Sequence, residues 1–256
     1  MNAPKDAPTE LLLRSATSDD RPAIIELCRQ SLGWTEDDPN EAFFEWKHDD
    51  NPFGPSPTWV AEDGAGNLVG LRTFLRWRFR RSDDTTINAV RAVDTATHPD
   101  WQGRGIFSRL TLGALDDLHD DGVDCVFNTP NDKSRPGYLK MGWHEVGKVP
   151  VSVRLTGLRS IPKLAGARTA AEMWSEESSV GRPASEALAD HDAVEALLAR
   201  IGNGSRISTD RTPAFLQWRY RFAPLRYRAV TLGRGSADGL VVFRVRRRGT
   251  ATEGTI

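Results

Sequence analysis

Two glycines stand where a strand-like segment gives way to a helical pattern. Between Val93 and Leu110 the sequence runs from apolar residues through a polar turn to Gly103 and Gly105, and a helix-type apolar spacing begins at Ile106. Glycines ahead of a helix start let several backbone N–H groups converge on one point, where the helix dipole adds partial positive charge. The segment therefore predicts a phosphate-binding turn, and an ordinary turn before a helix is the alternative.

The turn lacks residues that two common phosphate-binding motifs require. A nucleoside-triphosphate loop of the Walker type requires Gly-Lys followed by Ser or Thr, which is missing here. A dinucleotide-binding turn requires a third glycine, but Ser108 stands at that position. In that motif the strand also runs straight into the first glycine, whereas residues 98–101 intervene here. Both nucleotide-binding motifs are therefore poorly matched.

The turn instead resembles the pyrophosphate-binding motif of the GNAT superfamily of N-acetyltransferases, Gln/Arg-x-x-Gly-x-Gly/Ala. Gln102, Gly105 and the preceding Pro99 fall at the expected places, whereas Phe107 occupies the last small position. The resemblance implies that acetyl-CoA is bound as a co-substrate. Its pyrophosphate would then accept hydrogen bonds from the backbone of Gln102, Gly103, Arg104, Gly105, Ile106, Phe107 and Ser108.

A second motif typical of the same superfamily lies further along the chain. It reads Asn-x-x-Ala-x-x-x-Tyr followed by a Gly-aromatic pair, and here Asn131, Ser134 in place of Ala, Tyr138 and the pair Gly142-Trp143 keep this spacing. The resemblance implies that Tyr138 is the general acid, since a phenol can protonate the leaving thiolate, and that Asn131 hydrogen-bonds the cofactor. Packing of the Tyr138 ring and helix capping by Asn131 are the alternatives.

The general base is less clearly marked than the acid. Asp94 lies within an apolar strand beside the expected thioester, where partial burial would raise its pKa and make it a useful base. An ion pair of Asp94 with Arg91 or Arg72 is the alternative interpretation. His98 precedes a proline in a turn, which favours a turn-bonding role. Other candidates are Glu45, His48, His144, Glu145 or a chain of waters.

The elements that must position these residues follow from hydrophobic periodicity. Strands are expected at 11–14, 58–62, 68–80, 87–97, 123–128 and 143–155, and helices at 20–31, 39–47, 105–119 and 134–140. This order predicts an α/β fold with a mixed sheet. The resemblance implies the GNAT acyl-CoA N-acyltransferase fold, with acetyl-CoA between two splayed strands at 87–97 and 123–128. The pantetheine arm would pair with the strand edge at Val93 and Thr95.

Arginines alternate with apolar residues along the predicted strand at 68–80. They stand at positions 72, 76, 78 and 80. Because side chains alternate between the two faces of a strand, this pattern predicts a solvent-facing side of a half-buried sheet. A surface for an anionic acceptor is the alternative.

The chain also repeats part of itself. The segment Phe43-Phe-Glu-Trp-Lys47 recurs as Phe215-Leu-Gln-Trp-Arg219, and Leu68-Val-Gly-Leu-Arg72 recurs as Leu240-Val-Val-Phe-Arg244, both at an offset of 172 residues. Chance similarity between short apolar segments is the alternative. We therefore expect a GNAT acetyltransferase domain at 1–156, a linker at 157–188 and a partial second GNAT-like domain at 189–256 that lacks the acetyl-CoA motif.

Composition excludes several classes of protein. The 256 residues carry a formal net charge of −1, which argues against a general electrostatic grip on nucleic acid. No apolar run reaches the roughly 20 residues that span a bilayer. The N-terminal residues show no signal-peptide pattern and Cys28 and Cys125 form no metal-type pair, so a cytoplasmic protein without a metal is expected.

These observations lead to one function and one alternative. The expected function is an acetyl-CoA-dependent N-acetyltransferase, whose acceptor is a primary amine of a small molecule such as an amino sugar or aminoglycoside. The amine would attack the thioester directly in a ternary complex. A homodimer is compatible with the expected fold, and neither nucleic acid nor a membrane is expected as a partner. The alternative is a non-catalytic acyl-CoA-binding or interaction module on the same scaffold.

Overall fold

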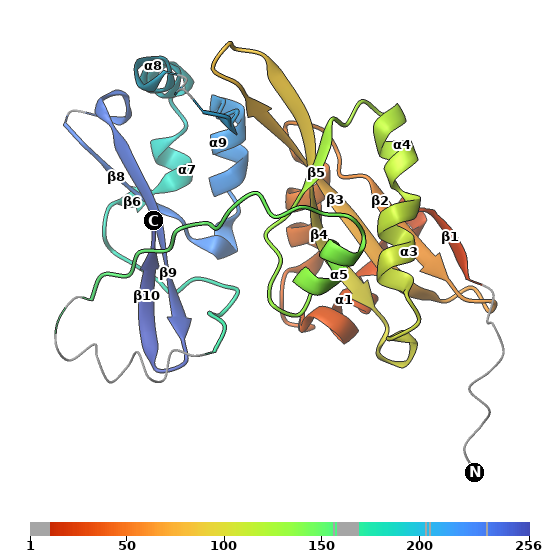
Figure 1. Ribbon diagram of the computed structural model, residues 1–256. Coiled ribbons are helices and arrows are strands. Elements are labelled where there is room, and N and C mark those ends of the chain that lie inside the picture. The colour runs from red at the N-terminus through yellow and green to blue at the C-terminus, as the bar shows by residue number, and fades with distance from the viewer. Residues whose placement is uncertain (1–10, 156, 158–168, 203, 205, 234) are drawn as a thin grey trace. The chain divides into compact units, whose positions relative to one another are not determined.

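The computed structural model describes residues 11–155, 157, 169–202, 204, 206–233 and 235–256. The chain forms two compact units (Figure 1). Unit 1 comprises Met1–Glu145 and Ser205–Asp210, and unit 2 comprises Val146–Gly204 and Arg211–Ile256. Each unit is described by itself.

Unit 1 is built on a mixed six-stranded sheet. Its strands are β1 (Leu12–Ser15), β2 (Thr58–Glu62), β3 (Leu68–Arg80), β4 (Thr86–Thr97), β5 (Cys125–Phe127) and β7 (Ser208–Thr209). Along the sheet the order is β1-β2-β3-β4-β5, and β7 pairs with the far end of β3. All neighbours are antiparallel except β4 and β5, which are parallel. The expected mixed α/β sheet is confirmed.

The helices of unit 1 cover both faces of β3. They are η1 (Ser18–Asp20), α1 (Arg21–Leu32), α2 (Asn40–Phe44), η2 (Glu45–Asp49), η3 (Pro99–Trp101), α3 (Ile106–Gly113), α4 (Leu115–Asp120) and α5 (Arg135–Lys140). Seven consecutive residues of β3, 69–75, are buried, so neither face of this part of the strand is open to solvent. Helix α1 contacts β3 and β4, and α3 contacts β2, β3 and β4.

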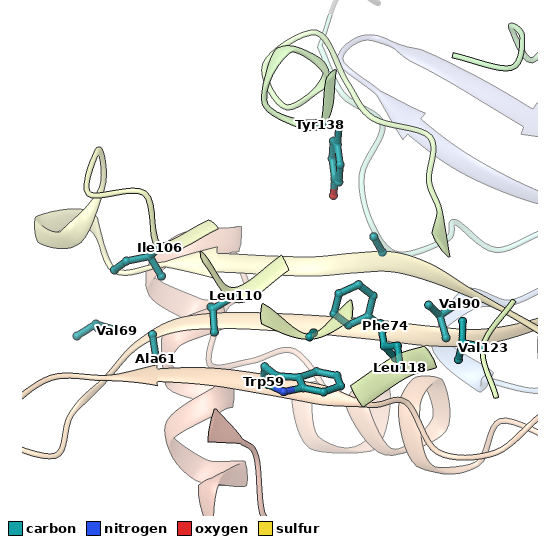
Figure 2. Packing of buried hydrophobic residues seen from close by; sticks show 12 residues of the cluster. Trp59, Ala61, Val69, Phe74, Val90, Ile106, Leu110, Leu118, Val123 and Tyr138 are labelled. Carbon is teal, nitrogen blue, oxygen red and sulfur yellow. The ribbon is translucent and has the colours of Figure 1, made fainter. Parts of the chain in front are cut away.

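The packing of α3 on the sheet fixes where the helix begins. Figure 2 shows Ile106 and Leu110 of α3 within a buried cluster that includes Trp59, Phe74 and Val90 of the sheet. Gly70 allows the close approach, because a Cβ at this position would lie 2.5 Å from Cγ2 of Ile106. The first turn of α3 is therefore held directly against β3.

Unit 2 is a smaller sheet with helices. It contains β6 (Arg182–Pro183), α7 (Ala184–Ala187), α8 (His191–Ile201), α9 (Pro213–Tyr220), η5 (Ala223–Leu225), β8 (Arg228–Thr231), η6 (Ser236–Asp238), β9 (Leu240–Arg248) and β10 (Ala251–Thr255). The sheet order is β10-β9-β8-β6, with all neighbours antiparallel. Side-chain oxygens cap two helices: Asp190 accepts from the N–H of Ala193, and Thr212 from that of Phe215.

The expected strand at 143–155 is wrong. Residues 143–155 contain no strand, and the alternating valines Val149, Val151 and Val153 are 71%, 83% and 72% exposed. Alternation indicates a strand only where another strand supplies hydrogen bonds and a packed layer covers the apolar face. The described part of the chain offers this segment neither.

The domain boundaries of the structure differ from those expected at sequence level. The first unit ends at Glu145, and it takes in residues 205–210 from much later in the chain. Of the expected linker at 157–188, residues 158–168 lie outside the described residues. The rest belongs to unit 2, where the N–H groups of Glu172 and Glu176 donate to the carbonyls of Arg247 and Val245 on β9. Within the described residues, no helix is long and apolar enough to cross a membrane.

Candidate functional site

The turn before α3 has an open, left-handed backbone. Gly103 and Gly105 have φ angles of +77° and +74°, and Gly105 is the N-cap residue of α3. A Cβ at either glycine would meet nothing within 4 Å. Glycine adopts positive φ without steric cost, which explains why the turn uses it at both positions. The backbone here is therefore exposed on the side from which a ligand would approach.

The amide groups of this turn are available for an anion. Among the residues that the structure describes, no group accepts a hydrogen bond from the backbone N–H of residues 103 to 108. The first N–H of α3 with a partner is that of Arg109, which donates to the Gly105 carbonyl over 3.0 Å. Gln102 N–H makes only a long bond, 3.4 Å, to the Pro99 carbonyl. Six consecutive amides at a helix N-terminus form an anion-binding arrangement.

The side chains around this turn leave its amides accessible. Ile106 is 1% exposed and packs on the sheet, and the ring of Phe107 lies edge-on to that of Tyr138, with centroids 5.2 Å apart. Phe107 therefore points into the core, so its bulk at the last small position of the motif does not cover the backbone. The guanidinium of Arg104 lies 4.5 Å over the Trp101 ring, and Gln102 is exposed.

Strands β4 and β5 separate next to this turn. They are paired from Ala89 to Arg91 on β4, and β5 ends at Phe127, opposite Arg91. Strand β4 continues to Thr97, and this later part pairs only with β3 on its other side. The described part of the chain thus leaves the edge of β4 that includes Val93 and Thr95 without a neighbouring strand. An extended ligand could hydrogen-bond there as an extra strand does.

A β-bulge interrupts β4 on this edge. Leu71 of β3 pairs with Ala96 and Thr73 pairs with Val93, so Asp94 and Thr95 together lie opposite the single residue 72. Asp94 has a φ of +42°, which is uncommon for a residue other than glycine. Bulges and such strained residues are concentrated near functional sites.

Two basic side chains hold the carboxylate of Asp94. Its Oδ2 accepts from Nζ of Lys47 over 2.5 Å and from Nε2 of His48 over 2.7 Å, and Nδ1 of His48 lies 3.0 Å from Oγ of Ser56. Lys47 and His48 are adjacent residues of η2, which is a π-helix. The wider turn of a π-helix is frequently found at functional sites.

These contacts correct the expectation for Asp94. Burial acts to raise the pKa of Asp94, but the charge of Lys47 and the hydrogen bond from His48 outweigh it and hold that pKa well below its usual range. Burial lowers the pKa of His48, and since an ionised carboxylate only accepts hydrogen bonds, the contact with Asp94 requires a proton on Nε2. The prediction of a raised pKa at Asp94 is wrong, because Lys47 of η2 supplies a positive charge and His48 of η2 a hydrogen bond to the carboxylate. They are not the arginines considered as alternatives.

We expect substitutions of Asp94 to separate a positioning role from a base role. Asn tolerates positive φ and can still accept hydrogen bonds from Lys47 and His48, whereas Ala can do neither. Asp94→Asn should keep turnover within about tenfold and Asp94→Ala should weaken acetyl-CoA binding by about tenfold or more, as strain of about 1–3 kcal/mol is no longer offset. Titration calorimetry and steady-state kinetics measure both. Loss of turnover in Asp94→Asn with unchanged affinity would restore the base assignment.

Tyr138 lies close to the open edge of β4. It is 6% exposed on α5, and its ring contacts those of Phe107 and Trp143. Its hydroxyl is directed toward the sheet (Figure 2) and accepts a hydrogen bond of 2.8 Å from a terminal nitrogen of Arg72. The other terminal nitrogen of Arg72 donates to Oγ1 of Thr95. The buried Arg72 is thus hydrogen-bonded both to the phenol of Tyr138 and to Thr95 in the bulge.

Arg72 is the residue of this site that the sequence misplaced. The alternation along β3 predicted a solvent-facing side chain, but Arg72 is 0% exposed. The prediction fails because α3 and the Tyr138 region cover this part of the strand. Arg76, four residues further along, is partly exposed as predicted and pairs with Asp121.

Three further candidates have local roles. The side-chain oxygen of Asn131 accepts from the N–H groups of Lys133 and Ser134, so it caps the turn that leads into α5. Nδ1 of His98 accepts from the N–H of Asp100, which is the turn-bonding role expected for it. Glu145 pairs with Arg135.

Comparison with protein-family models gives one finding. A model described as an acetyltransferase (GNAT) domain matches residues 13–146, more than half of the chain. The match includes the turn at 102–108, the bulge and Tyr138, and it leaves out unit 2 apart from Val146. No curated protein sequence matches the chain.

Solved structures resemble between 56% and 57% of the chain. An acetyltransferase from Trypanosoma brucei is 19% identical, with a TM-score of 0.43, over 57% of this chain and 100% of that one. A predicted acetyltransferase from Clostridium acetobutylicum, solved with acetyl-CoA, is 15% identical, with a TM-score of 0.46, over 56% and 96%. A glucosamine-6-phosphate N-acetyltransferase from Arabidopsis thaliana is 18% identical, with a TM-score of 0.44, over 57% and 98%.

Proposed function

The chain belongs to the GNAT family of acetyltransferases, and we propose that it transfers the acetyl group of acetyl-CoA to a primary amine of a small molecule. The observation that carries this proposal is the run of amides at residues 103–108 without partners in the described chain, next to the unpaired edge of β4. A diphosphate fits the first feature and an extended pantetheine arm fits the second.

The residues of unit 1 fit acetyl-CoA at each point where contact is proposed. The backbone of 102–108 binds the diphosphate, and Arg104 adds positive charge beside it. The edge of β4 at Val93 and Thr95 orients the pantetheine arm so that the thioester reaches the bulge. The amine nitrogen then bonds to the carbonyl carbon and the carbon–sulfur bond breaks.

Tyr138 and Asp94 have different roles in this proposal. Tyr138 gives its phenolic proton to the leaving thiolate, because its hydroxyl is buried next to the β4 edge and its oxygen is already oriented by Arg72. Asp94, whose pKa is lowered by Lys47 and His48, is a weak base at neutral pH. We assign it to holding the bulge. The proton lost by the amine passes to solvent.

We further propose that unit 2 is a partial second copy of unit 1. Along the chain, the elements β6-α8-α9-β8-β9-β10 of unit 2 correspond to β1-α1-α2-β2-β3-β4 of unit 1. Across the sheet, β6-β8-β9-β10 likewise corresponds to β1-β2-β3-β4, with antiparallel neighbours in both units. Strands β3 and β9 begin at Leu68 and Leu240, which is the 172-residue offset of the sequence repeat. The repeat corresponds to β1 to β4 of unit 1, and the turn at 102–108 lies outside it.

Two measurements, made one after the other, test the proposed function. Acetyl-CoA at about 100 times its Kd should stabilise the folded chain by about 2.7 kcal/mol, which raises Tm by several degrees. Release of free thiol is then followed with a panel of amino sugars, aminoglycosides and simple primary amines. Thiol release with one acceptor class supports the enzyme, and stabilisation without release on any acceptor supports a binding module. Absence of stabilisation contradicts both.

A further inference from the structure

The guanidinium of Arg72 is buried without an acidic partner. No carboxylate of the described residues lies within 4.0 Å of it. The other arginines of β3 behave differently: Arg76 pairs with Asp121, and Arg78 and Arg80 both pair with Asp210. A buried cation without a counter-ion is costly. The position of Arg72 therefore calls for an explanation other than fold stability.

The partners of this guanidinium are an alcohol, a phenol and aromatic rings. It donates to Oγ1 of Thr95 and, over 2.8 Å, to the hydroxyl oxygen of Tyr138. Its central carbon lies 5.0 Å from the ring centroid of Phe74 and 5.4 Å from that of Phe107. Its Nε has no hydrogen-bond partner within the described chain. The groups in direct contact with Arg72 are thus neutral, and the carboxylate of Asp94 in the same bulge acts on its charge only at longer range. Arginine does not lose this charge in proteins.

The direction of the hydrogen bond to Tyr138 is fixed by chemistry. A guanidinium has only N–H donors and no acceptor. Arg72 therefore donates to a lone pair of the phenol oxygen, and the proton of Tyr138 has to point elsewhere. The O–H bond of Tyr138 therefore points away from Arg72, which leaves the phenol oriented to donate its proton to another group.

We propose that Arg72 is a positioning residue that holds Tyr138 ready to donate and stabilises the phenolate that donation leaves behind. This inference rests on the proposed function. In the step concerned, the phenolic O–H bond breaks, an S–H bond forms on the departing thiolate, and the oxygen keeps the electron pair. The resulting negative charge lies in direct hydrogen-bond contact with the buried guanidinium, which has no carboxylate within 4.0 Å among the described residues. Solvent returns the proton after the product leaves.

A double-mutant cycle tests this inference. Arg72→Met should lower kcat by about tenfold to a hundredfold, the range expected for a lost hydrogen bond to a charged group, while the Kd for acetyl-CoA stays within about threefold. In a Tyr138→Phe background the same substitution should have little further effect, because residues that act through one another are not additive. Arg72→Lys keeps a cation and should recover part of the loss.

Controls separate this effect from simple damage to the fold. Arg76→Gln removes a guanidinium from the same strand and should leave kcat unchanged. Thermal unfolding, with and without acetyl-CoA, shows which variants are folded and bind. If Arg72→Met does not fold, Arg72→Lys and Arg72→Gln complete the cycle in its place.

The outcomes distinguish this inference from the proposed function. A full loss on substituting Arg72 in the Tyr138→Phe background overturns the inference, since Arg72 would then act on another atom such as the thioester carbonyl oxygen. An equal loss of acetyl-CoA affinity in Arg72→Met and Arg72→Lys overturns it as well. If Tyr138→Phe alone has no effect on kcat, the assignment of the acid fails whatever Arg72 does.

Discussion

Gly105→Val is expected to weaken acetyl-CoA binding severely in a chain that remains folded. The left-handed φ of +74° at Gly105 is poorly accessible to a β-branched residue, so the turn has to shift its amides. A valine side chain would also project into the open space where a ligand approaches. Loss of two charge-assisted hydrogen bonds, each worth about 1.5–3 kcal/mol, raises Kd by about 10² to 10⁴. Isothermal titration calorimetry with acetyl-CoA measures this change.

Gly122 provides a matched control for the strain. Its φ is also +74°, and a Cβ there would likewise meet nothing within 4 Å. Gly122 lies in the turn before β5, away from the amides at 103–108, so Gly122→Val imposes similar strain without touching the proposed site. It should lower Tm by an amount similar to Gly105→Val and leave Kd unchanged. Wild-type affinity in Gly105→Val would mean that the diphosphate binds elsewhere.

The turn at 102–108 could be predicted from the sequence because its signal is local. Gly103, Gly105 and the helical spacing that starts at Ile106 lie within a few residues of one another, and the backbone geometry follows from them. The same holds for Tyr138, whose placement depends on a short helix and the residues just before it. In both cases neighbours in sequence are also neighbours in space.

The partners of Asp94 and Tyr138 could not be predicted in this way. Lys47 and His48 precede Asp94 by 46 or 47 residues, and they meet it because of a bulge and a π-helix that no periodic pattern encodes. The pKa of Asp94 therefore moved in the direction opposite to the one inferred from burial alone. The sign of a pKa shift depends on which charges are near, and sequence spacing does not reveal them.

Arg72 shows that the alternation of residue types along a strand does not predict how deeply a side chain is buried. Arg72 and Arg76 stand on the same side of β3 and follow the same alternation, but one is completely buried and the other partly exposed. The alternation identifies the face of the strand, but the point at which the covering helices end is set by tertiary packing. The valines at 149–153 present the converse case, since their strand-like alternation has no covering layer in the described chain.

Tyr138→Phe is expected to lower kcat by about 10² or more, the usual range for loss of a general acid, with the Kd for acetyl-CoA within about threefold of wild type. The phenylalanine ring keeps the contacts with Phe107 and Trp143, so the packing around it is unchanged. Removal of the hydroxyl also leaves the buried Arg72 donor unsatisfied, which should cost about 1–3 kcal/mol of folding free energy. Kinetics therefore have to be measured well below the lowered Tm.

The split between kcat and Kd is what identifies the role of the phenol. A ring that only packed against the cofactor would contribute equally before and in the transition state, and phenylalanine keeps that ring, so Tyr138→Phe would then leave kcat in place. A proton donor acts only once the carbon–sulfur bond is breaking, so its loss appears in kcat alone. Tyr227→Phe removes a phenol from unit 2, where the Arg244 guanidinium lies 5.6 Å over the ring, and should change neither quantity. An unchanged kcat in Tyr138→Phe, whatever happens to the Kd, would leave Tyr138 as a packing residue and require another source for the proton.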